Sequence, residues 1–214
     1  KYAFMGCENL AVLKLPKTLT VIGDYAFHDC KSITEITLSE SITSINSHAF
    51  YGCKNLENVT LPSGLKSIGN YAFYNCEKAF TELKLPSGVT SLDVGAFRGC
   101  KSIKIIEINN GITQINKYVF AECSEIDRIA IPSSVYSISD TAFESSNISE
   151  IYGDAGSFAE TYADENKIPY KSDLSYQVLD DGTIEITQYN GSATVTFLYL
   201  AHKQKTNERR KTKC

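Results

Sequence analysis

One motif recurs along the chain and limits the folds that it can adopt. Ala-Phe-x-x-Cys is present six times, with Val119 in place of Ala in one copy, and a seventh copy has Ser146 in place of the cysteine. Successive Phe residues lie 23 or 24 positions apart. A period of about 20 to 50 residues is typical of repeat architectures. The chain is therefore predicted to fold as a stack of similar coils.

Apolar residues occupy further columns in the same register. They recur three, six and eight positions after the cysteine, as Leu56, Val59 and Leu61 do after Cys53. The alternation at the end of this segment predicts a short parallel strand in every copy. A proline follows in four copies and cannot donate a ladder hydrogen bond, so the chain turns there. A second extended piece, such as 43–45, leads into the Ala-Phe turn.

The Phe and Cys columns are predicted to form the interior. A single copy cannot bury its apolar face, so burial requires stacking. At about 4.8 Å per coil, seven coils make a rod about 34 Å long. The 24-residue copy holds its extra residue near 78–80, where we expect Phe80 in the slot that Leu10 occupies in the first copy. The predicted structural ladder comprises Phe27, Cys30, Phe50, Cys53, Phe73, Cys76, Phe97, Cys100, Phe120 and Cys123, with Phe4 and Phe143 extending the Phe stack.

The array cysteines share one column, which favours buried thiols over disulfides. Parallel Cβ vectors on neighbouring coils give poor disulfide geometry. A disulfide-stapled secreted fold would place its cysteines at varied depths, and no Cys-x-x-Cys spacing of a zinc site is present. We predict six reduced, inaccessible array thiols, so that only Cys214 in the tail reacts with thiol reagents.

The repeat unit resembles the BspA-like class of bacterial leucine-rich repeats. The resemblance rests on strings such as LENVTLPSGLKSIGNYAFYNC at 56–76 and covers residues 1 to about 152. The segment YGDAGSFAETYADENKIPY at 152–170 resembles the piece that closes such arrays in secreted proteins of anaerobic Gram-positive bacteria. The resemblance implies a leucine-rich-repeat solenoid of short parallel β-strands and turns, and a secreted or cell-surface location.

The array is predicted to span 1–152, with about seven 23-residue repeats, and we expect the parent protein to continue on its N-terminal side. A helical cap follows at 153–171 because the seventh copy degenerates, as the terminal repeat of a solenoid must. Its helix is predicted over 155–167, with Asp154 or Ser157 as N-cap and with Pro169 preventing continuation. The predicted apolar stripe is Phe158, Ala159, Tyr162 and Ala163.

The period changes after the cap. Alternating residues and two turn signals, Asp181-Gly182 and Asn190-Gly191, predict a β-hairpin or meander over 172–200. The tail at 201–214 holds six Lys or Arg against one Glu and so carries a charge of +5. The other 200 residues carry −9, which gives the chain its net charge of −4. We expect this tail to be disordered or to result from a truncation or a reading-frame artefact, and we expect no nucleic-acid partner. No run reaches the roughly 18 apolar residues of a membrane span.

No constellation of residues suggests catalysis. His28, His48 and His202 have no Ser, Cys or Asp partners at interpretable spacing, and the first two are expected on an exposed turn. No Gly-rich phosphate-binding loop is present. We predict that the chain is not an enzyme and has no cofactor or metal site.

Two surfaces are candidates for binding a protein. Outward strand positions, including Glu35, Glu82 and Arg128, carry mixed charge; the alternative is a solvated sheet face. Aromatic residues flank the Ala-Phe turn, and stiff amphipathic side chains of this kind are enriched in interfaces; the alternative is local packing that repetition multiplies. The candidate protein-binding residues are Tyr25, His48, Tyr51, Tyr71, Tyr74 and Tyr118.

The sequence thus predicts a non-catalytic interaction module with a protein partner, because solenoids present extended surfaces. The resemblance implies an adhesin that contacts host or neighbouring-cell proteins. Two alternatives stay open: a passive spacer that holds another domain away from the cell wall, and an accessory module of a larger secreted enzyme.

Overall fold

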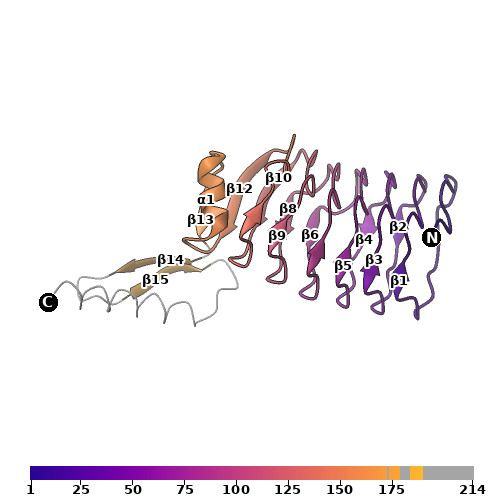
Figure 1. Ribbon diagram of the computed structural model, residues 1–214, viewed down its shortest axis with the longest axis horizontal. Helices are drawn as coiled ribbons and strands as arrows, with labels where there is room; N and C mark the ends of the chain where they lie inside the picture. The colour runs from indigo at the N-terminus through magenta and orange to yellow at the C-terminus, as the bar shows by residue number, and fades with distance from the viewer. Residues whose placement is uncertain (173, 179–183, 190–214) are drawn as a thin grey trace.

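The computed structural model of the protein describes residues 1–172, 174–178 and 184–189. Each repeat makes one coil, and the coils stack along the longest axis of the molecule (Figure 1). Neighbouring coils pair in parallel and keep the columns aligned, so that Ile45 lies beside Ile68 and Ile68 beside Leu92. The predicted solenoid of short parallel strands and turns is confirmed.

The coils contribute strands to two rows, and the first and the seventh coil contribute to one row each. The row that follows the cysteines consists of β2 (Glu35–Ile36), β4 (Asn58–Val59), β6 (Glu82–Lys84), β8 (Ile105–Glu107), β10 (Ile126–Ala130) and β12 (Ile148–Gly153). The row that precedes the Ala-Phe turns consists of β1 (Val21–Ile22), β3 (Ser44–Ile45), β5 (Ser67–Ile68), β7 (Ser91–Leu92), β9 (Gln114–Ile115) and β11 (Ser137–Ile138). Strands are short because turns occupy the rest of each coil.

The 24-residue repeat interrupts the first row between β4 and β6. The prediction that Phe80 takes the slot of Leu10 is wrong for the backbone, because Ala79 occupies that position. The Ala79 amide donates to the Cys76 carbonyl at 3.1 Å, just as the Leu56 amide donates to the Cys53 carbonyl in another repeat. Phe80 is the inserted residue, and its φ is 61°. Its ring lies edge-on to Phe73 and Phe97, at 5.1 and 5.5 Å between centroids. The Phe80 ring therefore fills the space that the small Ala79 leaves.

The phenylalanine rings form one stack through the interior. Neighbouring centroids from Phe4 to Phe143 are 5.2 to 5.8 Å apart. Phe4 is half-buried because a coil covers only one of its faces, whereas the other rings are buried. The aromatic column therefore runs through all seven coils.

A short helix closes the C-terminal end of the array (Figure 1). It is α1 (Phe158–Glu165), shorter than the predicted 155–167. Ser157 is its N-cap, but its side chain makes no capping bond, and the Gly156 amide donates instead to Glu160 Oε2 at 2.6 Å. The Tyr162 ring lies 6.1 Å from that of Phe143 and covers the end of the phenylalanine stack.

The predicted apolar stripe of the helix is wrong at one residue. Ala159, Tyr162 and Ala163 are buried, but Phe158 is 37% exposed. A Cβ added at Gly153 would lie 3.3 Å from the Ala159 Cβ, so the helix approaches the last coil through two small residues. This close approach turns the preceding residue, Phe158, toward solvent.

Three strands follow the helix. β13 (Tyr170–Ser172) pairs in parallel with β12, which the sequence did not predict. β14 (Leu174–Val178) pairs antiparallel with β15 (Ile184–Tyr189), in agreement with a hairpin. The rest of the predicted 172–200 hairpin or meander and the basic tail at 201–214 lie outside the described residues. Within the described ranges, no helix is long and apolar enough to cross a membrane.

Candidate functional site

The backbone of the Ala-Phe turn aims side chains from successive coils in one direction. The residue before Ala is left-handed, with φ of 55° at Tyr25, 58° at His48 and 51° at Tyr71. This region is uncommon for residues other than glycine. Each of these amides donates to a carbonyl of the next coil, as Tyr25 does to Ser47 at 3.0 Å and His48 to Asn70 at 2.8 Å. The inter-coil bonds therefore hold the aromatic side chains in register.

Two rows of rings result, one before Ala and one after Phe. In the first row, the His48 ring lies 4.6 Å from Tyr25 and 5.4 Å from Tyr71. In the second row, the Tyr51 ring lies 4.5 Å from His28 and 4.5 Å from Tyr74. We call this surface the aromatic ladder; it comprises Tyr25, His28, His48, Tyr51, Tyr71, Tyr74, Arg98 and Tyr118.

Arg98 connects the last tyrosine to the ladder. Gly95 stands at a position that is aromatic in five of the seven copies, and a Cβ there would collide with the Tyr71 ring. The Arg98 guanidinium carbon lies 5.7 Å from the Tyr74 centroid and 5.1 Å from that of Tyr118. Its Nη2 also donates to Glu122 Oε1 at 2.7 Å. The structure thus places all six predicted protein-binding residues along one edge, with Arg98 between the tyrosines.

Sequence reasoning missed His28 and Arg98 as members of this surface. Both directly follow the Phe of their repeat, in the column that holds Tyr51 and Tyr74. The column position itself was the available signal, because equivalent positions in stacked coils lie side by side.

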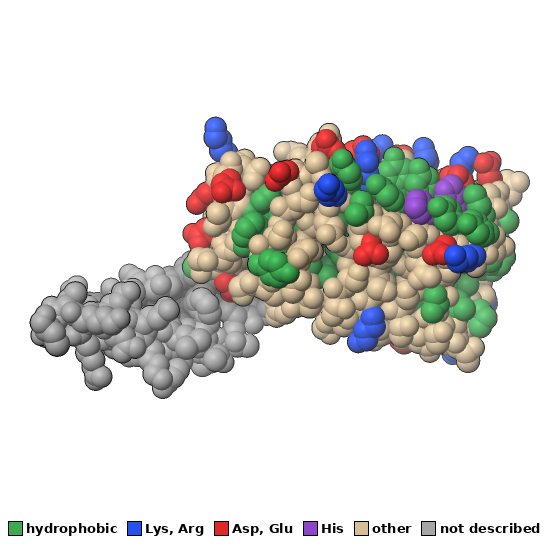
Figure 2. Space-filling view, viewed as in Figure 1, with side chains coloured by type: hydrophobic (Ala, Val, Ile, Leu, Met, Phe, Trp, Pro, Cys, Tyr) green, Lys and Arg blue, Asp and Glu red, His purple; other side chains and the backbone are tan. Residues whose placement is uncertain are grey.

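The ladder side chains are half-buried. The expectation of exposed histidines is therefore wrong: the His28 side chain is 17% exposed, because tyrosine rings of its own and the next coil cover it. Figure 2 shows histidine side chains among hydrophobic ones on the N-terminal half of the array. Burial, followed by the nearby charge of His28, lowers the pKa of His48. Burial also raises the pKa of Tyr51.

The cysteine column serves the interior. Each buried thiol donates to the carbonyl of a phenylalanine in the preceding coil, at 3.0 Å for Cys53 to Phe27 and 3.3 Å for Cys123 to Phe97. Ser146 makes the same bond to Phe120 at 2.6 Å. Hydroxyl and thiol are thus interchangeable donors in this column.

One array cysteine differs from the prediction. Cys7 is exposed, whereas Cys30, Cys53, Cys76, Cys100 and Cys123 are buried and free. Burial raises the pKa of Cys30 to about 11 and the pKa of Cys53 and Cys123 to about 12. Because the thiolate is the reactive form, the buried thiols are inert.

Thiol labelling of the native protein should therefore modify Cys7 and Cys214 and leave the five buried thiols intact. Denaturation should make all seven cysteines reactive. The measurement is a spectrophotometric thiol titration with and without denaturant, followed by peptide mass spectrometry. Rapid native labelling of Cys76 would contradict the buried column, and Cys7→Ser should remove one native equivalent.

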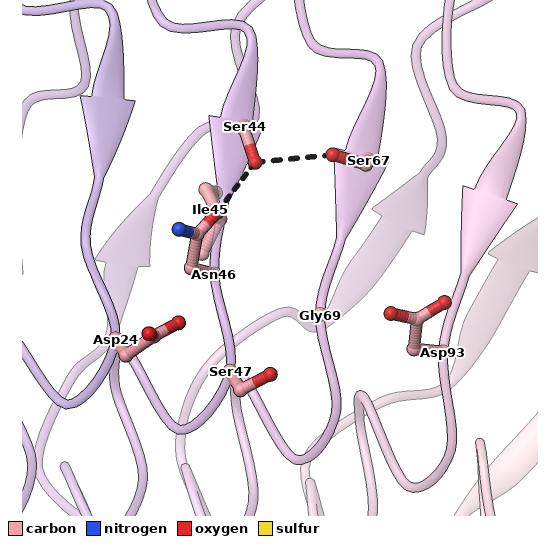
Figure 3. A pocket seen from close by; sticks show the side chains of 8 residues that line it. All are labelled: Asp24, Ser44, Ile45, Asn46, Ser47, Ser67, Gly69 and Asp93. Atoms are coloured by element: carbon pink, nitrogen blue, oxygen red, sulfur yellow. Dashed lines mark hydrogen bonds between the residues drawn. The ribbon is translucent and has the colours of Figure 1, made fainter.

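A polar hollow of about 130 Å³ lies beside the second row of strands (Figure 3). Ser67 Oγ donates to Ser44 Oγ at 3.1 Å, and Ser44 Oγ donates to Asn46 Oδ1 at 2.6 Å. Asp93 accepts a bond from Ser91 at 2.8 Å. Within the described ranges, no group of His, Cys, Asp or Glu is arranged to hold a metal ion. The Ser67–Ser44 bond therefore joins two neighbouring coils, whereas the other two bonds each lie within one coil.

The outward sheet face carries paired charges. Lys84 bonds to Glu107 and Lys171 to Glu150, each at 2.7 Å. Exposed pairs of this kind contribute little to stability, about 0 to 1 kcal/mol. The Lys84 and Lys171 side chains are 79% and 58% exposed, whereas the ladder side chains are half-buried.

Comparisons with known proteins agree with this architecture. The family model described as BspA type leucine rich repeat region matches residues 1–79 and 45–163, with six copies. No curated protein matches the chain.

Solved structures of bacterial repeat proteins are similar in fold. A leucine-rich repeat protein from Bacteroides ovatus is 25% identical, with a TM-score of 0.63 over 82% of this chain and 55% of that one. A leucine rich cell surface protein from Faecalibacterium prausnitzii is 26% identical, with a TM-score of 0.59 over 80% and 50%. The Treponema pallidum leucine rich repeat protein, at 20% identity and a TM-score of 0.53, covers 72% and 78% and shows the fold alone.

The chain spans about half the length of the first two structures. The family match covers most of the array and the cap, and it agrees with the coils, the strand rows and the phenylalanine stack. The chain therefore belongs to the BspA type leucine rich repeat family.

Proposed function

We propose that this chain is a non-catalytic interaction module of a secreted or cell-surface bacterial protein, and that it binds a protein partner through the aromatic ladder. The proposed role is that of an adhesin toward host or neighbouring-cell proteins. The observation that carries the proposal is the double row of half-buried rings on one edge of the array. The family and the surface location printed for the Faecalibacterium relative support it.

The chemistry of the ladder suits an interface. Tyrosine and arginine are the residues that most often dominate binding energy, and the ladder holds both. Ring stacking restricts the side chains, as at Tyr51 between His28 and Tyr74. Restricted side chains lose less conformational entropy on binding. The ladder is therefore organised before a partner arrives.

The repeating geometry favours an elongated partner. Ladder positions recur once per coil, so a long partner contacts several equivalent positions at once. Several copies of a short ligand would also gain affinity by avidity. By contrast, two lysines on the sheet face, Lys84 and Lys171, are already ion-paired with glutamates of the chain itself.

The test is binding of the immobilised chain to matrix proteins and to surfaces of co-resident cells. The double variant Tyr51→Ser/Tyr74→Ser should weaken binding at least about 30-fold, since loss of even one of the two interface anchors costs about 2 kcal/mol. Tyr136→Ser is the matched control, because Tyr136 is 59% exposed and lies outside the ladder. Its binding should equal that of the unmodified chain.

Unchanged binding by the double variant would place the interface elsewhere, and Arg128→Ala would then test the sheet face. Absence of binding to every surface would contradict the proposal and favour the spacer function. Circular dichroism of each variant establishes that the array remains folded.

A further inference from the structure

The two ladder histidines belong to one closed cluster of four rings. His48 lies 4.6 Å from Tyr25 and 5.6 Å from Tyr51. His28 lies 5.5 Å from Tyr25 and 4.5 Å from Tyr51. The two histidines come from adjacent coils, so a change in either one acts on the same pair of tyrosines.

Each of the two imidazoles has one nitrogen buried in the ladder. The Nδ1 atoms of His28 and His48 are buried and make no aligned hydrogen bond. Asp29 Oδ2 lies 3.1 Å from the His28 Nδ1, within ion-pairing distance but outside hydrogen-bond alignment. An imidazolium carries a hydrogen on both nitrogens. Protonation of His48 therefore buries an N–H group without an acceptor, which is unfavourable.

The surrounding charges act unequally on the two rings. The Tyr25, Tyr51 and Tyr71 rings pack against His48, and the His28 charge opposes a second positive charge there. The Asp24 carboxylate favours the charged form of His48, but it is already ion-paired with Lys1 at 2.9 Å.

Around His28, the neighbours are the Tyr25 and Tyr51 rings and the Asp29 carboxylate. Arg98, which stacks on Tyr74, adds positive charge farther along the ladder. Acid thus adds positive charge to a half-buried cluster in which a carboxylate lies beside His28, whereas His48 makes no ion pair with any residue that the structure describes.

We propose that His48 makes the aromatic ladder acid-sensitive, so that its protonation opens the ring stack and releases the protein partner. Release rests on the proposed function, whereas opening of the stack is a property of the chain alone. When His48 is protonated, its ring turns toward water to solvate the Nδ1–H group. Tyr25 and Tyr71 then lose the ring between them, and the organised surface is lost.

The direction of the effect follows from linkage. The pKa of His48 is lower in the folded chain than its ordinary value of 6.5, chiefly because of burial. Below about pH 6.5 the unfolded chain therefore binds more protons than the folded chain. The free energy of unfolding consequently decreases as the pH is lowered. The contribution of neutral His48 is fully present above this range and is lost as pH falls through the folded pKa. Every tenfold weakening of proton binding to His48 in the folded chain increases the unfolding equilibrium constant about tenfold at acid pH.

The repeat itself supplies the test variants. Tyrosine stands at the position of His48 in neighbouring coils, as Tyr25 and Tyr71, and at the position of His28, as Tyr51 and Tyr74. The variant His28→Tyr/His48→Tyr therefore keeps the aromatic rows and leaves no histidine in the ladder. His202→Gln is the matched control, because the chain has three histidines and the third lies outside the ladder.

The experiment compares unfolding and histidine NMR titration at about pH 7.5 and about pH 5, a range in which histidine changes charge. The unfolding equilibrium constant should rise several-fold more on acidification in the unmodified chain and in His202→Gln than in the double variant. The same acidification should weaken partner binding several-fold, but not in the double variant. An identical stability response in all three proteins would overturn the proposal.

The two proposals fail separately. A normal acid response of stability, with binding unaffected by Tyr51→Ser/Tyr74→Ser, would refute the ladder as the binding site and leave the ring opening intact. Ladder-dependent binding that is equally tight at both pH values would refute acid release and leave the proposed function intact.

Discussion

Replacing Phe73 with alanine should lower the free energy of unfolding by about 3 to 5 kcal/mol. The Phe73 side chain is 0% exposed, and its ring lies between those of Phe50 and Phe97, at 5.2 and 5.4 Å. The Phe80 ring adds an edge contact at 5.1 Å. Backbone bonds to the neighbouring coils, such as the Phe73 amide to Ala96 at 2.8 Å, keep the coils in place. The cavity therefore cannot collapse, and its full cost remains.

Urea unfolding followed by circular dichroism and by tyrosine fluorescence measures this loss, and coincidence of the two transitions establishes two-state behaviour. Phe4→Ala is the matched control, because Phe4 is half-buried and stacks on Phe27 alone. Its loss should be less than half that of Phe73→Ala. Equal losses would show that the stack does not act as one interior column.

The periodic part of the fold was predictable because every coil solves the same packing problem. An apolar residue that recurs at a fixed position must point to the same side of each coil, so Phe27, Phe50 and Phe97 were assigned to the interior from spacing alone. Strand rows and turns followed from the same columns. Repetition thus replaces the long-range information that a globular fold would require.

The departures from prediction lie where periodicity ends. Phe80 entered the core as an insertion, a position for which no other copy offers a comparison. β13 gave no alternating signal in three residues, and the exposure of Phe158 depends on how closely Ala159 approaches Gly153. Each of these outcomes is set by a contact that occurs once.

The candidate site was predictable in part. The columns identified Tyr51 and Tyr74 as neighbours, but counting tyrosines alone missed His28 and Arg98 in the same column. The sequence also did not predict the half-burial of the histidines. Their exposure depends on how the flanking rings tilt, and Tyr71 tilts because Gly95 leaves room for its ring.

The second large effect is expected at the cap, where Ala163→Glu should lower the free energy of unfolding by about 3 kcal/mol or more. Ala163 is 0% exposed and lies on the face of α1 that packs on the last coil. An unpaired carboxylate buried there is strongly destabilising. The helix can avoid this cost by undocking, which exposes Phe143 and Ile151, both buried beneath it in the intact chain. The docking free energy of the cap therefore sets the upper limit of the loss.

Limited proteolysis reports undocking of the cap directly. Ala163→Glu should become sensitive to cleavage around 153–172 while the N-terminal coils stay protected, since each coil of a solenoid contacts only its neighbours. Thr161→Glu places the same charge on the exposed face of the same helix and should change stability by no more than about 0.5 kcal/mol. If both variants were equally stable and equally resistant, α1 would not protect the end of the phenylalanine stack, and Tyr162 would have no role in closing it.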